Sequence, residues 1–279
     1  MNEKKAQSEH CVILSVSSDI GLALAADWLS RGFSVSGSFR THTDAVRNLE
    51  SKGLHSVHLD LGDVMAVKEA AETLGEAPWS RLVLAAGSQE PVGLFEQVGP
   101  VEWGRSIETN FIAQFQFLAW MLPFRRRDRG KVPRVLSFAG GATNRATTHY
   151  SAYTISKIAS IKMTELLAAE VADTAFTILG PGWVRTKIHE ATLQAGILAG
   201  DNHETTVRHL QNDDFFPLES VIRAINWIME APPNAVSGRN ISAVHDPWGS
   251  AELTSSLISD PDLYKLRRSG NERFASSSR

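Results

Sequence analysis

Short apolar segments alternate along the chain with longer segments in which apolar residues recur at helical spacing. Short segments rich in β-branched and apolar residues are typical of strands that are buried on both faces of a sheet. The pattern predicts seven such strands, at residues 12–16, 33–39, 56–59, 81–85, 134–138, 175–179 and 240–244.

The longer segments predict helices at residues 22–31, 103–124, 153–171 and 218–229, and Gly32 ends the first of them. Strands that alternate with helices indicate an α/β fold. We therefore expect a single Rossmann-type, doubly wound parallel sheet with helices on both faces. The domain would span residues 11–250, after a flexible N-terminus at 1–10 and before a partly disordered extension at 251–279.

Charge and composition exclude several function classes. The net charge of −3 gives no basic surface for nucleic acid or an anionic membrane. The longest apolar segment without charges, residues 109–124, is too short to span a bilayer, and residues 1–10 lack the apolar run of a signal peptide. A single cysteine, Cys11, fits a reducing compartment. We expect a cytoplasmic protein with no nucleic acid or membrane partner.

Tyr153 and Lys157 are the strongest candidates for chemistry. They are four residues apart in a predicted helix, so both side chains lie on one face. A tyrosine ordinarily titrates near pH 10, and a nearby cation lowers its pKa, which makes the phenol a usable acid or base. Since this spacing also arises by coincidence, the pair needs support from its surroundings.

That support comes from motifs at the carboxyl ends of the predicted strands. With the sequence Tyr-Thr-Ile-Ser-Lys at 153–157, their order and spacing resemble those of the short-chain dehydrogenase/reductase family over residues 11–250. The motifs are Ser17-Ser18-Asp19-Ile20-Gly21 after the first strand, Asp60 after the third, Ala86-Gly87 after the fourth, Asn110 in the next helix, and the segment from Pro181 to Thr186 after the sixth.

The resemblance implies a catalytic role for three residues. Tyr153 would protonate a carbonyl oxygen while a nicotinamide delivers hydride, Lys157 would lower the pKa of that tyrosine and hold the nicotinamide ribose, and Asn110 would support a water chain to the lysine. It also implies that Pro181, Gly182 and Thr186 hold the nicotinamide amide. The full set of implied cofactor-binding residues is Ser15, Ser17, Ser18, Asp19, Ile20, Gly21, Arg40, Thr41, Asp60, Leu61, Ala86, Gly87, Tyr153, Lys157, Pro181, Gly182, Val184 and Thr186.

The end of the second strand indicates which cofactor is used. In dinucleotide-binding folds an acidic residue there binds the ribose 2′-hydroxyl of NAD, whereas a basic residue suits the 2′-phosphate of NADP. This strand ends at Arg40 and Thr41, with no carboxylate before Asp44. NADP(H) is therefore favoured over NAD(H), although Arg40 could also be an ordinary surface charge.

The glycine-rich loop departs from the family pattern. Ser15 and Asp19 stand where the family has glycines, and only Gly21 remains. Ser15 removes a glycine where the backbone turns tightly. The Asp19 carboxylate would lie near the expected diphosphate and repel it, and the hydroxyls of Ser17 and Ser18 could compensate.

A second departure concerns the serine that polarises the carbonyl in the family, about thirteen residues before the tyrosine. Ala139 and Gly140 occupy that place. Nearby hydroxyls that could substitute belong to Thr143, Thr147 and Thr148. The loss of one donor to the developing oxyanion can cost about 10²–10³ in rate.

The polar region from 187 to 217 predicts an excursion that covers the substrate, because ligands bind beyond the carboxyl ends of strands in such sheets. Its histidines at 189, 203 and 209 lack metal-ligand spacing, so we expect loop or surface roles. Trp183 is either a pocket wall or core packing. The arginines at 125–127 and 129 suit a helix C-terminus better than a phosphate site.

These observations favour an NADP(H)-dependent oxidoreductase acting on a small-molecule carbonyl or alcohol. Two alternatives stay open: a catalytically impaired homologue that serves as a dinucleotide-binding sensor or scaffold, and a protein that has lost cofactor binding. Sugars, oxoacyl groups and small ketones are all possible substrates. The resemblance also implies a homodimer or homotetramer.

Overall fold

The computed structural model describes residues 9–127 and 130–270. Within them, a seven-stranded sheet has the order β3-β2-β1-β4-β5-β6-β7, and every neighbouring pair is parallel. This confirms the predicted α/β fold with a doubly wound sheet. The strands are β1 His10–Leu14, β2 Ser34–Phe39, β3 His55–His58, β4 Arg81–Leu84, β5 Arg134–Phe138, β6 Ala175–Gly180 and β7 Arg239–Ser242.

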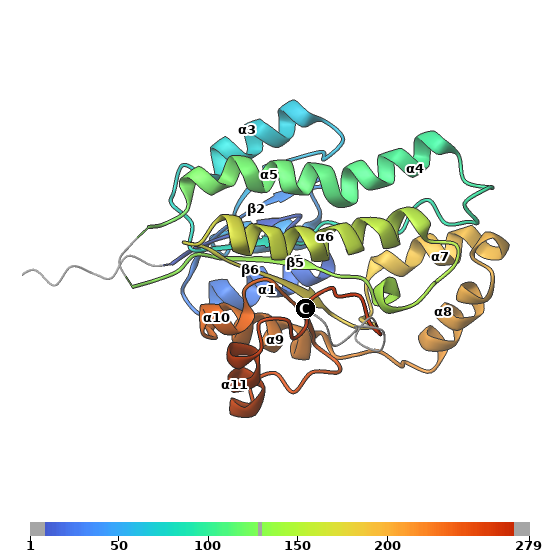
Figure 1. Cartoon of the computed structure of the whole chain (residues 1–279). Coiled ribbons are helices and arrows are strands. Elements are labelled where there is room, and N and C mark those ends of the chain that lie inside the picture. The colour runs from blue at the N-terminus through green and yellow to red at the C-terminus, as the bar shows by residue number, and fades with distance from the viewer. Residues whose placement is uncertain (1–8, 128–129, 271–279) are drawn as a thin grey trace, which may run out of the picture.

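Helices cover both faces of this sheet (Figure 1). Helices α1, α2, α9, α10 and α11 contribute to one apolar core, and α3, α5 and α6 contribute to the core on the opposite face. Their bounds are α1 Asp19–Ser30, α2 Asp44–Glu50, α3 Val64–Leu74, α4 Pro100–Ile107, α5 Ala113–Met121, α6 Ser151–Glu170, α7 Glu190–Ala195, α8 Asp201–Gln211, α9 Leu218–Glu230, α10 Pro233–Val236 and α11 Ala251–Ser259.

Helix α1 shows how the sequence starts and stops an element. The Ser18 hydroxyl accepts a hydrogen bond from the Gly21 amide and so caps the helix. The buried face includes Trp28, whose indole N–H donates to Asn226 of α9. Gly32, at φ 80°, then turns the chain into β2. The helix predicted at 22–31 corresponds to α1, which begins three residues earlier, whereas α2 and α3, capped by Thr43 and Asp63, were not predicted.

The predicted continuous helix over 103–124 is wrong in one respect. It is interrupted at Glu108–Ile112 by a π-helical segment between α4 and α5, and it ends in a short 3₁₀ turn. The Gln114 side-chain amide donates to the carbonyls of Asn110 at 2.9 Å and Thr109 at 3.2 Å, which satisfies backbone groups in the bulge. Such insertions often mark functional sites, and this one contains Asn110.

The excursion after β6 is folded rather than irregular. It contains α7 and α8, with 3₁₀ turns at Lys187–His189 and Gly196–Ala199. Within the predicted extension, α11 buries Leu253 and Leu257. The predicted flexible N-terminus at 1–10 is wrong for His10, which is buried and begins β1, and residues 1–8 and 271–279 lie outside the described residues. No helix in the described part of the chain is long and apolar enough to cross a membrane.

Candidate active site

The order of the strands creates a crevice at the carboxyl edge of the sheet. Strand β1 pairs with β2 on one side and with β4 on the other, so the chain connections diverge between β1 and β4. Ligands of open α/β sheets bind in the crevice at such a switch point. The loop after β1 (residues 15–18) and the segment after β4 (residues 85–87) lie at this edge.

The loop after β1 makes its tight turn without a glycine at position 15. Ser15 has φ 64°, in the left-handed region that favours glycine. Its carbonyl accepts a hydrogen bond from the Ser18 amide at 3.0 Å, and its own amide donates to the Ser38 hydroxyl of β2 at 3.0 Å. A Cβ on Gly21 would lie 2.6 Å from the Ser15 carbonyl oxygen, so glycine is required there.

Asp19, Ile20 and Ser17, which follow or belong to this loop, differ in their contacts. The Asp19 carboxylate accepts a hydrogen bond from the backbone amide of Lys187 at 2.8 Å. The Ile20 side chain packs against the apolar core beside α1, so any contact between Ile20 and a cofactor would involve its backbone. Ser17 is half-buried. The expected compensation by Ser17 and Ser18 stays a prediction.

Arg40 and Thr41 lie exposed just beyond β2. Among the described residues no carboxylate pairs with Arg40. The neighbouring Phe39 ring stacks on His42 with centroids 4.7 Å apart. At the end of β3, the Asp60 carboxylate accepts from the Gly62 amide at 2.9 Å. An unpaired cation at this edge is available to a ligand phosphate.

Leu61 and Ala86 both pack toward the interior. Leu61 is half-buried against the core beneath α3 and α5, and Ala86 is buried after β4. The Ala86 carbonyl accepts from the Gln114 side chain at 3.2 Å, which ties the segment after β4 to α5. These contacts fix the backbone on either side of the crevice.

Tyr153 and Lys157 are both buried on α6 and share one face of that helix. The Lys157 Nζ lies 5.5 Å from the centroid of the Tyr153 ring, within the range of a cation–π contact. Neither the phenol nor the ammonium has a hydrogen-bond partner among the residues that the structure describes. Neither atom is among the fully buried, unpaired polar atoms of the described residues, so both side chains are buried while their polar ends remain accessible to a ligand.

Burial shifts the two groups in opposite directions. Desolvation raises the pKa of Tyr153 to about 12 and lowers the pKa of Lys157 to about 8. This differs from the expectation that Lys157 lowers the pKa of Tyr153, because burial disfavours the charged phenolate. In the free chain the tyrosine is therefore held as the neutral acid.

Gly140 lies directly against the tyrosine. A Cβ built on it would be 3.0 Å from Tyr153 Cε1, 3.3 Å from the phenol oxygen and 3.2 Å from Lys157 Cγ. The position that lacks the family serine is thus the one beside the acid. Of the three threonines proposed as substitutes, Thr143 is tied to it, since its hydroxyl donates to the Gly140 carbonyl at 3.1 Å.

Asn110 is buried, and its side-chain amide is hydrogen-bonded to neighbouring residues. Its side-chain oxygen accepts from the Ser88 amide, and its side-chain nitrogen donates to the Ser88 carbonyl, both at 2.9 Å. A Cβ on Gly87 would lie 3.8 Å from that oxygen and 3.9 Å from Lys157 Nζ. The structure thus brings Gly87, Asn110 and Lys157 together.

The segment after β6 completes the crevice. Gly182 has φ 80°, and a Cβ there would lie 2.3 Å from Val244 Cγ2, so glycine is required at this turn. Val184 is buried, and the Thr186 hydroxyl donates to its carbonyl at 3.4 Å. Pro181 is half-buried. These residues lie beyond the carboxyl end of β6, where the sequence placed them.

Comparison with known proteins assigns the family. The sequence profile described as short chain dehydrogenase matches residues 9–195. The chain belongs to the short-chain dehydrogenase/reductase family.

Its similarity to individual members is distant. A 3-amino-tetrahydro-pyrrolizinone reductase of Xenorhabdus hominickii is 25% identical over 210 residues, covering 73% of this chain and 71% of the relative. An NADPH-dependent 3-dehydrocapnine reductase of Ornithobacterium rhinotracheale is 30% identical over 193 residues, covering 64% and 66%. A crystal structure of a variant actinorhodin polyketide ketoreductase with NADPH is similar with TM-score 0.73 and 19% identity, covering 84% of this chain and 95% of that one.

Beyond the family motifs, the excursion is anchored by stacked rings. Trp183 lies between His189 and His209, with ring centroids 4.4 Å apart on each side. The His189 ring is buried, which lowers its pKa, and its Nε2 bonds the Val184 carbonyl at 2.9 Å. Trp183 is 37% exposed, so it is neither simple core packing nor fully free. The described residues contain no cluster of three or more potential metal ligands.

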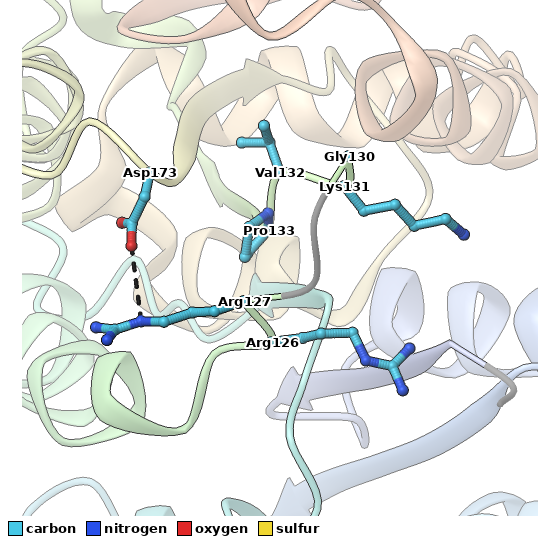
Figure 2. A pocket seen from close by; sticks show the side chains of 7 residues that line it. All are labelled: Arg126, Arg127, Gly130, Lys131, Val132, Pro133 and Asp173. Atoms are coloured by element: carbon cyan, nitrogen blue, oxygen red, sulfur yellow. Dashed lines mark ion pairs between the residues drawn. The ribbon is translucent and has the colours of Figure 1, made fainter.

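A basic cleft lies far from this site, at the amino end of β5 (Figure 2). Arg126, Arg127, Lys131 and Asp173 help to line it, and Arg127 points toward Asp173. Arg125 donates both to Asp173 and, at 2.6 Å, to the Leu122 carbonyl at the end of the preceding helix. The helix-terminus interpretation of this arginine cluster therefore accounts for Arg125.

Sequence reasoning missed two positioning residues. Gln114 joins the π-helical bulge to the segment after β4, and Ser38 supports the strained backbone of Ser15. Gln114 is four residues after Asn110, a spacing that puts both on one helix face and could have signalled the link. The role of Ser38 depends on strand register and has no local signal.

Proposed function

We propose that this chain is an NADP(H)-dependent oxidoreductase that reduces a carbonyl or oxidises an alcohol on a small molecule. The observation that carries the proposal is the unpaired, buried pair Tyr153 and Lys157 at the switch-point crevice. Gly87 and Asn110 lie beside that pair. The family is one of oxidoreductases, and such a pair in that setting suits proton exchange with a reacting oxygen.

The residues around the crevice fit a nicotinamide dinucleotide. Arg40 and Thr41 would hold the 2′-phosphate, Asp60 and Leu61 would flank the adenine, and Lys157 would bind the nicotinamide ribose. The turn at Pro181-Gly182 and Thr186 would hold the nicotinamide amide. The bound cofactor would supply or accept the hydride.

Tyr153 would donate the proton to the carbonyl oxygen during reduction. Its raised pKa, about 12, keeps the proton on the phenol until a developing oxyanion takes it. With a pKa of about 8, the Lys157 amine is mostly protonated at neutral pH and would give up its proton more readily than an ordinary lysine. The pairing of Asn110 with Ser88 holds the backbone beside Lys157 in place.

Arg40 supports NADP(H) over NAD(H). It is exposed at the end of β2 and has no carboxylate partner among the described residues. Two proteins similar to this chain carry NADPH in their names. We expect Arg40→Ala to raise the KM for NADPH by at least tenfold and to leave the KM for NADH within about twofold. Equal changes in both would contradict the assignment.

The activity itself is tested by NADPH oxidation with a panel of sugars, oxoacyl thioesters and small ketones. Turnover of at least one of them, lost in Tyr153→Phe, is the expected result. No turnover in either direction, together with tight NADPH binding in calorimetry, would instead favour a catalytically impaired sensor or scaffold. That second function is motivated by Gly140 at the serine position and by the carboxylate of Asp19 near the expected diphosphate.

We further propose a homodimer or homotetramer formed through α5 and α6. Ile112, the last residue of the π-helical segment before α5, and Ile155, on α6, are apolar yet 37% and 50% exposed. Light scattering of the protein and of a variant with Ile155→Glu would test this, with dissociation expected in the variant. An unchanged mass would place any interface elsewhere.

A further inference from the structure

The segment after β6 crosses over the crevice. Strands β1 and β6 are separated in the sheet by β4 and β5, which places them about 14 Å apart. Nevertheless Asp19, which follows β1, bonds directly to the backbone of Lys187, which follows β6. The covering segment, defined as residues 183–189, must therefore reach back across the carboxyl ends of β5 and β4.

A second contact places the covering segment over β4. A Cβ built on Gly87 would lie 3.9 Å from Ile188 Cδ1 and 3.9 Å from Lys157 Nζ. The Ile188 side chain thus reaches the same point as the catalytic lysine candidate. Asp19 follows β1 and Gly87 follows β4, and the covering segment contacts both of them. The segment therefore lies over the switch point between these two strands.

Asp19 occupies the position that a phosphate would need. It is the first residue of α1, and its carboxylate lies beside a helix N-terminus, where doubly wound folds bind the diphosphate of a dinucleotide. The carboxylate also accepts a hydrogen bond from the Lys187 amide at 2.8 Å. Asp19 therefore presents a negative charge both to the N-terminus of α1 and to the covering segment, as a bound diphosphate would.

We propose that Asp19 is an internal anion that clasps the covering segment over the crevice and competes with the diphosphate of the cofactor. This inference rests on the proposed function and adds that Asp19 sets the affinity for the dinucleotide. Binding would break the bond to Lys187 and move the covering segment. Both ends of the segment, Trp183 and His189, are stacked on each other, and Trp183 also stacks on His209, so the movement would involve the residues between them.

Three substitutions at this position separate charge from hydrogen bonding. Asp19→Asn removes the charge but keeps an oxygen that can accept from Lys187, whereas Asp19→Ala and Asp19→Gly remove both. A charge-assisted hydrogen bond contributes about 1.5–3 kcal/mol, which corresponds to a change in affinity of about 10- to 100-fold. Asp63→Asn is the matched control, because Asp63 also lies at a helix N-terminus, that of α3, and caps it through the Met65 and Ala66 amides.

The first measurement needs no cofactor. Hydrogen exchange of the peptide that contains the Lys187 amide should be at least tenfold faster in Asp19→Ala and Asp19→Gly than in wild type. Asp19→Asn should lie between them, and Asp63→Asn should match wild type. Unchanged exchange in Asp19→Ala and Asp19→Gly would overturn the clasp whether or not the protein is an enzyme.

The second measurement is calorimetry with NADPH and with adenosine 2′-phosphate, which has no diphosphate. NADPH should bind about 10- to 100-fold more tightly to the three Asp19 variants, and adenosine 2′-phosphate should bind within twofold of wild type. Unchanged or weaker NADPH binding in the variants would overturn the competition while the proposed function stands. If wild type and every variant fail to bind NADPH, the proposed function fails, and the competition fails with it.

Discussion

The two ends of the crevice differ in how they depart from the family pattern. At the end formed by β4, α5 and α6, the chain retains Asn110, Tyr153 and Lys157 and brings Asn110 and Lys157 beside Gly87. At the end formed by β1 and α1, the turn has Ser15 at φ 64° and an acidic Asp19 in place of two glycines. The end proposed for proton transfer thus keeps these three residues and lacks only the serine, whereas the end proposed for the diphosphate has lost two of its glycines.

The difference shows which substitutions a backbone can absorb. The turn after β1 keeps its shape because Ser38 holds the Ser15 amide and because Gly21 leaves room for the Ser15 carbonyl. At position 140 a glycine packed against Tyr153 stands in place of the serine, and the Thr143 hydroxyl donates to the Gly140 carbonyl. The neighbouring strand thus preserves the backbone of the turn, whereas the hydroxyl nearest to position 140 bonds the backbone.

The largest effect is expected at the retained end. Tyr153→Phe should lower kcat/KM for any accepted carbonyl by about 10²–10⁴, because the phenol is the proton donor. Tyr150→Phe is the control, since it removes a buried phenol from the same helix region whose hydroxyl is already paired with Thr192 at 2.7 Å. Steady-state NADPH oxidation measures both. Equal rates in wild type and Tyr153→Phe would contradict the assigned role.

The next effect concerns the position beside the acid. Gly140→Ala should destabilise the fold by about 1–3 kcal/mol through overpacking against Tyr153 and Lys157, because its Cβ would lie 3.0 Å from the ring. Gly140→Ser adds the same Cβ and a hydroxyl, so its kcat should exceed that of Gly140→Ala by at least about tenfold. Equal kcat values would show that a donor here does not serve the reaction.

Lys157→Met should stabilise the fold at pH 7 by about 1–3 kcal/mol, since it removes a buried ammonium without a partner. The folded pKa is lowered to about 8 from 10.5. Between those values the unfolded chain keeps a proton that the native chain has lost, so the stability of wild type rises with pH. The gain in the variant should therefore be greatest below pH 8 and shrink as the pH rises through this window. Urea unfolding at several pH values measures it, and a gain that grows with pH would refute the account.

The smallest effect is expected in the turn after β1. Ser15→Gly should raise the free energy of unfolding by about 0.4–1 kcal/mol, because glycine adopts a positive φ without strain. Ser17→Gly, at a neighbouring position without positive φ, should instead lower the free energy of unfolding. Urea denaturation of the two variants compares them directly. A loss of stability in both would mean that Ser15 is not strained.

The sequence predicted the sheet, its strands and the residues of the retained end, because hydrophobic periodicity and motif order are local signals. It did not predict the π-helical bulge at Asn110 or the contacts of Gln114, which depend on how α5 packs over β4. The acidic residue at position 19 indicated repulsion of a diphosphate, but its bond to Lys187 could not be predicted, since these residues are 168 positions apart. The spacing of Tyr153 and Lys157 predicted a lowered pKa for the tyrosine, whereas burial, a tertiary effect, raises it.

The most direct test of the central claim follows a hydride. NADPH carrying deuterium at both C4 positions of the nicotinamide is incubated with wild type and an accepted carbonyl, and the alcohol is analysed by mass spectrometry. We predict deuterium on the former carbonyl carbon with wild type and at least a hundredfold less product with Tyr153→Phe. Product without deuterium from wild type, or equal labelled product from both proteins, would contradict hydride transfer assisted by Tyr153.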